Sequence, residues 1–172
     1  KGRGFSDEII NRFGLGFAPD SRNKLKSVLK AEDFDETDML SAGLIIQPKE
    51  EKRDTYDRFR GRIIFPIEDA RGRVIAFGGR ILGDGEPKYL NSPETSLFHK
   101  GRVLYGQKIA SGPARKLGNI IVTEGYTDVM ALNQAGIDNA VAPLGTALTE
   151  DQIRALWKIV PEPILCFDGD AA

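Results

Sequence analysis

Cysteine, histidine and long apolar runs are all scarce in this sequence. Its single cysteine excludes an internal disulfide framework, and one cysteine with one histidine excludes a zinc finger or zinc ribbon within these 172 residues. No apolar stretch approaches the roughly 18 residues that a membrane-spanning helix needs, and no signal-peptide pattern is present. We therefore expect a cytoplasmic protein with no membrane partner.

The remaining composition, 41% hydrophobic and 28% charged, is ordinary for one globular domain or two small ones. The charges are unevenly placed. Residues 1–118 carry 22 Lys and Arg against 17 Asp and Glu, a net charge of +5, whereas residues 119–172 carry 2 against 8, a net charge of −6. This asymmetry suits a basic part that holds a polyanion and an acidic part that holds cations. The alternative is a solvated surface without a partner.

The first part of the chain has the pattern of short helices followed by a β-hairpin. Polar caps and apolar residues at helical spacing predict helices at 6–13, 22–30 and 35–42, and polar residues 47–55 predict an exposed loop. Strands are expected at 62–67 and 73–77, around a turn at 69–72. Pro66 indicates an edge or a bulge, and a glycine-rich loop then runs to about Ser96.

From residue 119 onward, apolar strands alternate with helices. Strands are expected at 119–123, 139–142 and 163–167, with helices at 126–134 and 149–157 between them. This order predicts a right-handed parallel unit of buried strands.

The predicted fold class is therefore an α+β N-terminal subdomain followed by a partial α/β subdomain with a Rossmann-like parallel sheet. The expected boundaries are 1–116 for the basic subdomain and 117–172 for the parallel one. Cys166 is expected in a buried strand, and an incomplete sheet is expected to expose an apolar edge.

Two acidic clusters follow apolar runs of the parallel part. Glu124 and Asp128 come after its first strand, and Asp168 and Asp170 come after its last. The carboxyl ends of parallel strands meet at one edge of a sheet, where crowded carboxylates repel one another unless a cation separates them. Hard oxygen ligands suit Mg²⁺, so the pattern predicts a divalent-metal site for phosphoryl or nucleotidyl transfer.

The spacing within each cluster refines this prediction. Residues two apart on an extended chain, such as Asp168 and Asp170, share a face at roughly 7 Å. Glu124 and Asp128 share one side of a helical turn if the helix begins directly after the strand. The alternative is structural, because an Asp-Gly-Asp sequence is often a turn with helix-capping acids and strand-terminal acids are common.

The segments 122–129 and 165–171 resemble the signature of the Toprim module, which primases, topoisomerases and some nucleases share. Other segments resemble the RNA-polymerase domain of bacterial replicative (DnaG-type) DNA primases, and the resemblance covers the chain from Phe5 to Ala172. These segments are 56–67, 74–80, 87–95, 98–101, 104–106 and 144–146.

The resemblance implies synthesis of short RNA primers on single-stranded DNA from ribonucleoside triphosphates during replication, with an RNA–DNA hybrid as product. It implies that Glu124, Asp168 and Asp170 are catalytic and that they bind Mg²⁺ or Mn²⁺ together with Asp128. Two cations would assist an in-line displacement, and Glu124 is also a candidate base.

The resemblance also implies a nucleotide- and DNA-binding groove. Its members here are basic, aromatic or amide side chains: Arg58, Arg60, Arg80, Lys88, Tyr89, Asn91 and Lys100. Arg58, Arg60 and Arg62 alternate, so on a strand they would share one face. The alternatives are a solvent-exposed strand face for the arginines, a surface lysine for Lys88, and a tyrosine that covers the core edge.

Several parts of the resembled family are not in this sequence: the rest of the Toprim sheet with a further acidic pair, a zinc-binding N-terminal module and a C-terminal module that binds the replicative helicase. We therefore expect zinc only outside this chain, and little or no primer synthesis by this piece alone. Two alternatives remain open: another Toprim enzyme (a nuclease or topoisomerase), and a non-catalytic single-stranded-DNA-binding module.

Overall fold

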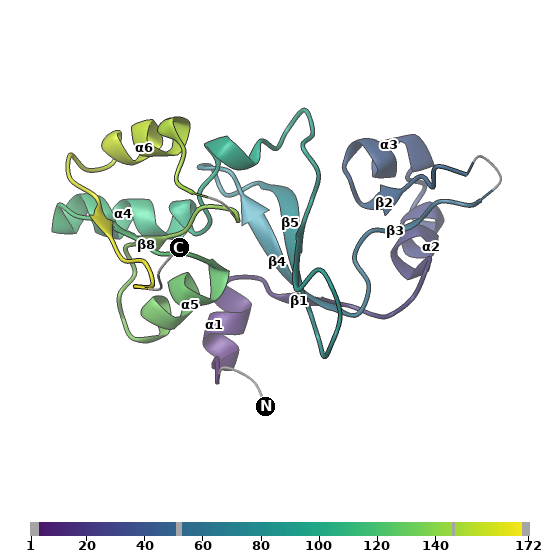
Figure 1. The fold of residues 1–172 in the computed structure, drawn as a ribbon, viewed down its shortest axis with the longest axis horizontal. Helices are drawn as coiled ribbons and strands as arrows, with labels where there is room; N and C mark the ends of the chain where they lie inside the picture. Colours follow the sequence, from purple (N-terminus) through teal and green to yellow (C-terminus); the bar gives the residue numbers. More distant parts are fainter. Residues whose placement is uncertain (1–3, 51–52, 146, 170–172) are drawn as a thin grey trace. The chain divides into compact units, whose positions relative to one another are not determined.

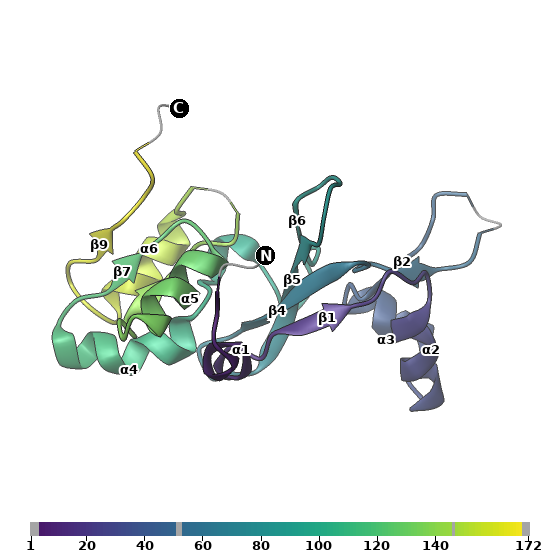
Figure 2. The ribbon, with the colours of Figure 1, turned by 90° about the horizontal axis from the view of Figure 1, so that it is seen from below.

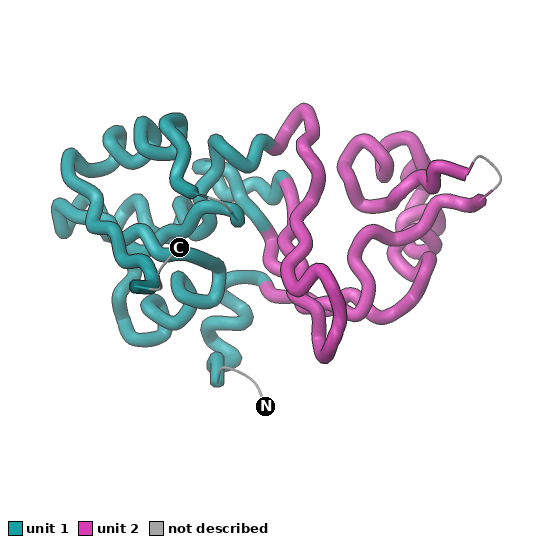
Figure 3. The backbone as a smooth tube through the Cα atoms, in the orientation of Figure 1, with its two compact units in different colours: residues 1–14, 67–75, 99–172 teal, residues 15–66, 76–98 magenta. Residues whose placement is uncertain are grey.

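The computed structural model describes residues 4–50, 53–145 and 147–169 (Figure 1). Internal contacts divide the chain into two compact units, coloured separately in Figure 3. Unit 1 comprises residues 1–14, 67–75 and 99–172, and unit 2 comprises residues 15–66 and 76–98. The predicted boundary between residues 116 and 117 concerns modules of the sequence and stays a prediction.

Most of an antiparallel sheet with the strand order β1-β4-β5-β6 belongs to unit 2, and the parts of β4 and β5 within residues 67–75 belong to unit 1. Unit 2 also contains a smaller β2-β3 pair and two short helices. The predicted helices and hairpin are confirmed, but the predicted loop up to Ser96 is wrong in part because it contains β6. The elements are β1 (Gly16–Ala18), α2 (Lys24–Ala31), α3 (Glu36–Ser41), β2 (Ile45–Ile46), β3 (Tyr56–Asp57), β4 (Arg62–Glu68), β5 (Val74–Ile81) and β6 (Tyr89–Asn91).

Strand pairing explains why a proline is tolerated at position 66, and close packing explains why residue 79 is a glycine. Pro66 lies in a strand between two others, but β1 pairs only with residues 62–64, so the missing N–H of Pro66 falls beyond the end of that pairing. At Gly79, an added Cβ would lie 2.8 Å from a ring carbon of Phe59. Only glycine therefore lets β5 approach the buried Phe59 this closely.

Unit 1 is built around a three-stranded parallel sheet with the order β8-β7-β9. Helix α1 joins this unit because the Ser6 N–H donates to Gln134 Oε1 (2.8 Å) and Arg12 pairs with Asp138 (3.0 Å). The elements are α1 (Asp7–Arg12), the 3₁₀ helix η1 (Lys100–Arg102), α4 (Gln107–Leu117), β7 (Ile121–Val122), α5 (Tyr126–Gln134), β8 (Ala140–Val141), α6 (Glu150–Trp157) and β9 (Ile164–Leu165).

The core of unit 1 fills with small and branched side chains from both helices and strands. Its buried members are Leu104, Ala110, Ala114, Ile120, Val122, Val141, Leu156 and Val160. The predicted alternation of parallel strands and helices is confirmed, although each strand spans only two residues. Within the described ranges, none of the helices has both the length and the apolar character to cross a membrane.

The sequence analysis missed one helix of this unit and wrongly predicted that its last strand is buried. Helix α4 was not expected, and the last strand is not buried: Ile164 and Leu165 are 50% and 56% exposed, and Cys166 is an exposed free cysteine just after β9. The strand pairs with β7 on one side and is the last in the order of the described sheet. The expected exposure of an apolar edge is confirmed.

Two neighbours on α6 test the location of this core. Leu156 is fully buried, whereas Trp157 is 60% exposed. We expect Leu156→Ala to lower the free energy of unfolding by about 2–5 kcal/mol because it leaves a cavity. Trp157→Ala should change it by less than about 0.5 kcal/mol. Urea denaturation of both variants measures the difference, and equal losses would place the core elsewhere.

Candidate metal centre and nucleic-acid surface

Glu124 and Asp168 meet at the carboxyl edge of the parallel sheet. Strands β7 and β9 are adjacent and parallel, with Val122 opposite Leu165 (Figure 2). Beyond their ends, the backbone N–H of Asp168 donates to Glu124 Oε1 at 2.6 Å. Both acidic side chains are exposed at this edge. The structure thus brings together two acids that are 44 residues apart in the sequence.

Asp128 has a second role that its position in α5 explains. The helix begins at Tyr126, two residues after Glu124, so Glu124 precedes the helix and the condition for a shared helical side is not met. Asp128 lies in the first turn, where its Oδ2 accepts from the N–H of Gly125 at 3.1 Å. This bond satisfies a backbone donor at the helix start, which is the structural alternative for such an acid.

The donor chemistry at this edge suits a hard divalent cation, because carboxylate oxygens are its preferred ligands. Asp170 lies outside the described residues. Among the residues that are described, no group of three Asp, Glu, His or Cys side chains is close enough to hold a metal. The metal-binding role of Glu124, Asp128, Asp168 and Asp170 therefore stays a prediction, supported at the Glu124–Asp168 contact.

The arginines of unit 2 do not share a strand face, so that prediction is wrong. Strand β3 ends at Asp57 and β4 begins at Arg62, and Gly61 between them has φ of +58°, which favours glycine and turns the chain. Arg62 is buried and donates to the Pro87 carbonyl at 2.9 Å. It thus fixes the segment that leads to Lys88, while Arg60 is exposed.

Burial lowers the pKa of two of these arginines without removing their charge. Burial lowers the pKa of Arg58, whose Nε has no hydrogen-bond partner among the described residues. Burial and then the nearby charge of Arg60 lower the pKa of Arg62. Because an arginine starts far above neutral pH, both guanidinium groups stay charged under physiological conditions.

The pairing of β5 with β6 gathers three more of the predicted residues. Arg80 lies opposite Tyr89 in the register, and its guanidinium carbon is 5.8 Å from the centre of the Tyr89 ring. Asn91 lies opposite Gly78. Tyr89 is 40% exposed and Lys88 is exposed. This strand pair presents a cation, an aromatic ring and an amide from adjacent positions.

Lys100 lies in η1, and two residues that the sequence analysis did not select hold this turn against α6. Gln152 is buried, and its Nε2 donates to the carbonyls of Lys100 (3.0 Å) and Val103 (2.9 Å). The Thr149 hydroxyl donates to the Gly101 carbonyl. The Thr-x-x-Gln spacing of a capping box could have identified these two residues from the sequence. In the structure, Gln152 Oε1 accepts a hydrogen bond from the Thr149 N–H at 3.0 Å.

A parallel sheet with acids at its carboxyl edge is the arrangement of a Toprim domain, and the Toprim domain family matches residues 118–172. The family described as the DNA primase catalytic core, N-terminal domain, matches residues 1–111. The chain belongs to this DNA primase family. The expected mixed fold, an α+β part followed by a parallel α/β part, is confirmed.

Relatives with known names support the same assignment. A DNA primase of Pseudomonas putida is 55% identical over the whole chain, and one of Escherichia coli K12 is 46% identical over 99% of it. The chain spans 26% and 29% of their respective lengths, so it corresponds to about a quarter of such a protein.

Two solved structures have the same fold. A DNA primase domain from Pseudomonas aeruginosa has a TM-score of 0.89 and 53% identity. The DnaG primase catalytic domain bound to single-stranded DNA has a TM-score of 0.86 and 47% identity. Each comparison covers 98% of this chain and 52% of the other chain.

Replacing Gln152 tests its hold on the turn that carries Lys100. Gln152→Leu leaves two carbonyls unpaired, so we expect a loss of about 1–3 kcal/mol in unfolding free energy. Hydrogen exchange at the Arg102 amide, which donates to the His99 carbonyl, should also accelerate. Gln134→Leu is the control, because Gln134 also makes two backbone hydrogen bonds but is exposed to water. Unchanged exchange in Gln152→Leu would refute this role.

Proposed function

We propose that this chain is a part of a DNA primase catalytic core, which joins ribonucleotides into short RNA primers on a single-stranded DNA template during replication. The contact between Glu124 and the Asp168 backbone carries this proposal. This hydrogen bond supports a shared acidic edge because it joins the segment after β7 to the segment after β9. Family membership and the single-stranded-DNA complex of a relative add to it.

In this proposal the acidic edge holds Mg²⁺ or Mn²⁺, with Glu124, Asp128, Asp168 and Asp170 as its ligands. When bound, such cations neutralise phosphate charge and assist an in-line displacement at phosphorus. Glu124 and Asp168 act as hard oxygen donors and orient the cation, and Glu124 is a candidate base. Asp128 also caps α5, so its carboxylate is held in a defined orientation.

In this proposal, basic, aromatic and amide side chains bind nucleic acid and nucleotide. Arg58, Arg60, Arg80, Lys88, Asn91 and Lys100 bind the template or the incoming ribonucleoside triphosphate, and Tyr89 stacks on a base. A fixed guanidinium suits phosphate because it presents several donors at once. The half-exposed Tyr89 ring beside Arg80 supports the stacking role.

Further partners follow from the same proposal. The RNA–DNA hybrid is the product that leaves the surface, the replicative helicase binds a C-terminal module outside this sequence, and zinc binds an N-terminal module outside it. The solved structure of a primase from Aquifex aeolicus, of which this chain covers 41%, contains zinc-binding and RNA polymerase domains. This supports the assignment of zinc to a separate module.

Replacing Asp168 separates the catalytic proposal from a binding module. In the full-length primase, Asp168→Ala should reduce primer synthesis by at least about 100-fold and leave single-stranded-DNA affinity within about two-fold, because the acid acts on the metal rather than on the template. Extension assays with labelled ribonucleotides and fluorescence anisotropy measure the two effects.

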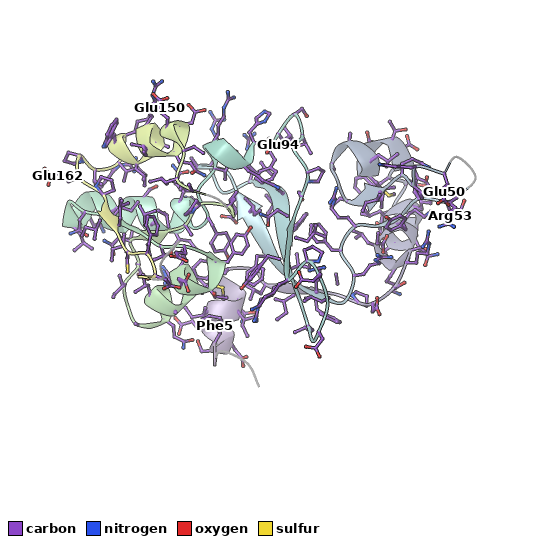
Figure 4. All side chains as sticks on the ribbon, viewed as in Figure 1. Phe5, Glu50, Arg53, Glu94, Glu150 and Glu162 are labelled. Carbon is purple, nitrogen blue, oxygen red and sulfur yellow. The ribbon has the colours of Figure 1, made fainter. Side chains whose placement is uncertain are left out.

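Glu162→Ala is the matched control for this prediction. Glu162 (Figure 4) is an exposed acid just before β9 and has no role in the proposed site. Glu162→Ala should keep both the primer synthesis and the single-stranded-DNA affinity of the wild type. Retained synthesis in Asp168→Ala would refute the metal role, and metal-dependent DNA cleavage without ribonucleotides would favour a Toprim nuclease instead.

A further inference from the structure

Two arginines from distant parts of unit 2 lie against one tyrosine ring. The guanidinium carbons of Arg22 and Arg60 are 4.8 Å and 4.9 Å from the centre of the Tyr56 ring. Guanidinium groups this close to an aromatic ring are attracted by its electron-rich face. The ring therefore restricts both side chains, although Arg22 and Arg60 are themselves exposed to solvent.

A buried aspartate explains how Arg22 reaches this ring. The N–H of Asp57 donates to the Arg22 carbonyl at 2.8 Å. The Asp57 carboxylate, only 3% exposed, accepts from the backbone N–H groups of Leu25 (2.7 Å) and Lys26 (3.0 Å). Asp57 thus ties the start of α2 to β3 and places Arg22 beside Tyr56, the residue that precedes Asp57.

Neither of these two arginines forms an ion pair within the described part of the chain. Among the described residues, no carboxylate forms an ion pair with Arg22 or Arg60, whereas Arg53 pairs with Glu50 (Figure 4). Both carboxylate oxygens of Asp57 accept hydrogen bonds from the backbone at the start of α2. Two restricted guanidinium groups therefore have no carboxylate partner within the described part of the chain, and such groups are well suited to bind phosphate.

We propose that Arg22 is a further phosphate-binding residue for single-stranded nucleic acid, and that Tyr56 is a positioning residue that holds Arg22 and Arg60 for adjacent phosphates. The proposal rests on the proposed function and extends its surface to the segment between β1 and α2. The Tyr56 ring contacts guanidinium groups, so its role is to orient them rather than to stack on a base.

The test measures binding of a fluorescent single-stranded oligonucleotide across a series of salt concentrations. Arg22→Gln should weaken binding several-fold at about 0.1 M salt and reduce the salt slope by about 0.7, the value for one lost phosphate contact on a single strand. Arg53→Gln, whose guanidinium is paired with Glu50 in the wild type, is the control and should keep the wild-type slope.

Tyr56 variants test the positioning role separately. Tyr56→Phe retains the ring and should bind like the wild type, whereas Tyr56→Leu should weaken binding by about two- to five-fold. The effects of Tyr56→Leu and Arg22→Gln should be less than additive in the double variant. Circular dichroism and thermal unfolding identify the variants that keep the fold. If Tyr56→Leu does not fold, the test uses Tyr56→Phe, and weaker binding by this ring-retaining variant would contradict the positioning role.

The outcomes separate this inference from the function on which it rests. If Arg60→Gln lowers the salt slope and Arg22→Gln does not, the inference is wrong and the proposed function stands. If neither Arg60→Gln nor Arg80→Gln changes binding, the proposed surface itself is wrong. Full additivity of Tyr56→Leu with Arg22→Gln would overturn the positioning role.

Discussion

The parallel pairing of β7 with β9 is the constraint on which the acidic edge depends. Parallel neighbours end at the same edge, so residues that follow the two strands must lie close together. The Asp168 N–H then donates a hydrogen bond to the Glu124 carboxylate and fixes that side chain at this edge. A slip of one residue would turn alternate side chains to the other face and remove this arrangement.

In unit 2 the charged candidate binding side chains are cations, mainly arginines, rather than acids. Three of its arginines lie against aromatic rings or backbone carbonyls rather than carboxylates: Arg62 donates to the Pro87 carbonyl, Arg80 lies near the Tyr89 ring, and Arg60 lies near the Tyr56 ring. An ion pair would fix an arginine but cancel its field. A ring or a carbonyl fixes the side chain and leaves its net charge, which suits the proposed nucleic-acid surface.

Much of the fold was predictable because it follows simple periodicity. The hairpin, the strand–helix alternation and the meeting of two acidic strand ends all follow from local pattern and chain order. Helix α4 was missed because Gly112 and Pro113 lie inside it, and both residues ordinarily weaken helices. An exposed apolar edge was expected, but it was not assigned to β9, because an apolar run predicts a strand without saying whether another layer covers it.

The residues that position the proposed surface were hardest to find because they are polar and buried. A pattern-based interpretation assigns Asp57 and Gln152 to the surface, as most such residues are. Their burial is favourable only because distant backbone groups satisfy them: the start of α2 for Asp57, and the carbonyls around η1 for Gln152. Those partners become neighbours only after folding. Sequence spacing can therefore identify side chains suited to bind phosphate or metal, whereas the buried bonds that orient them become visible only in the folded chain.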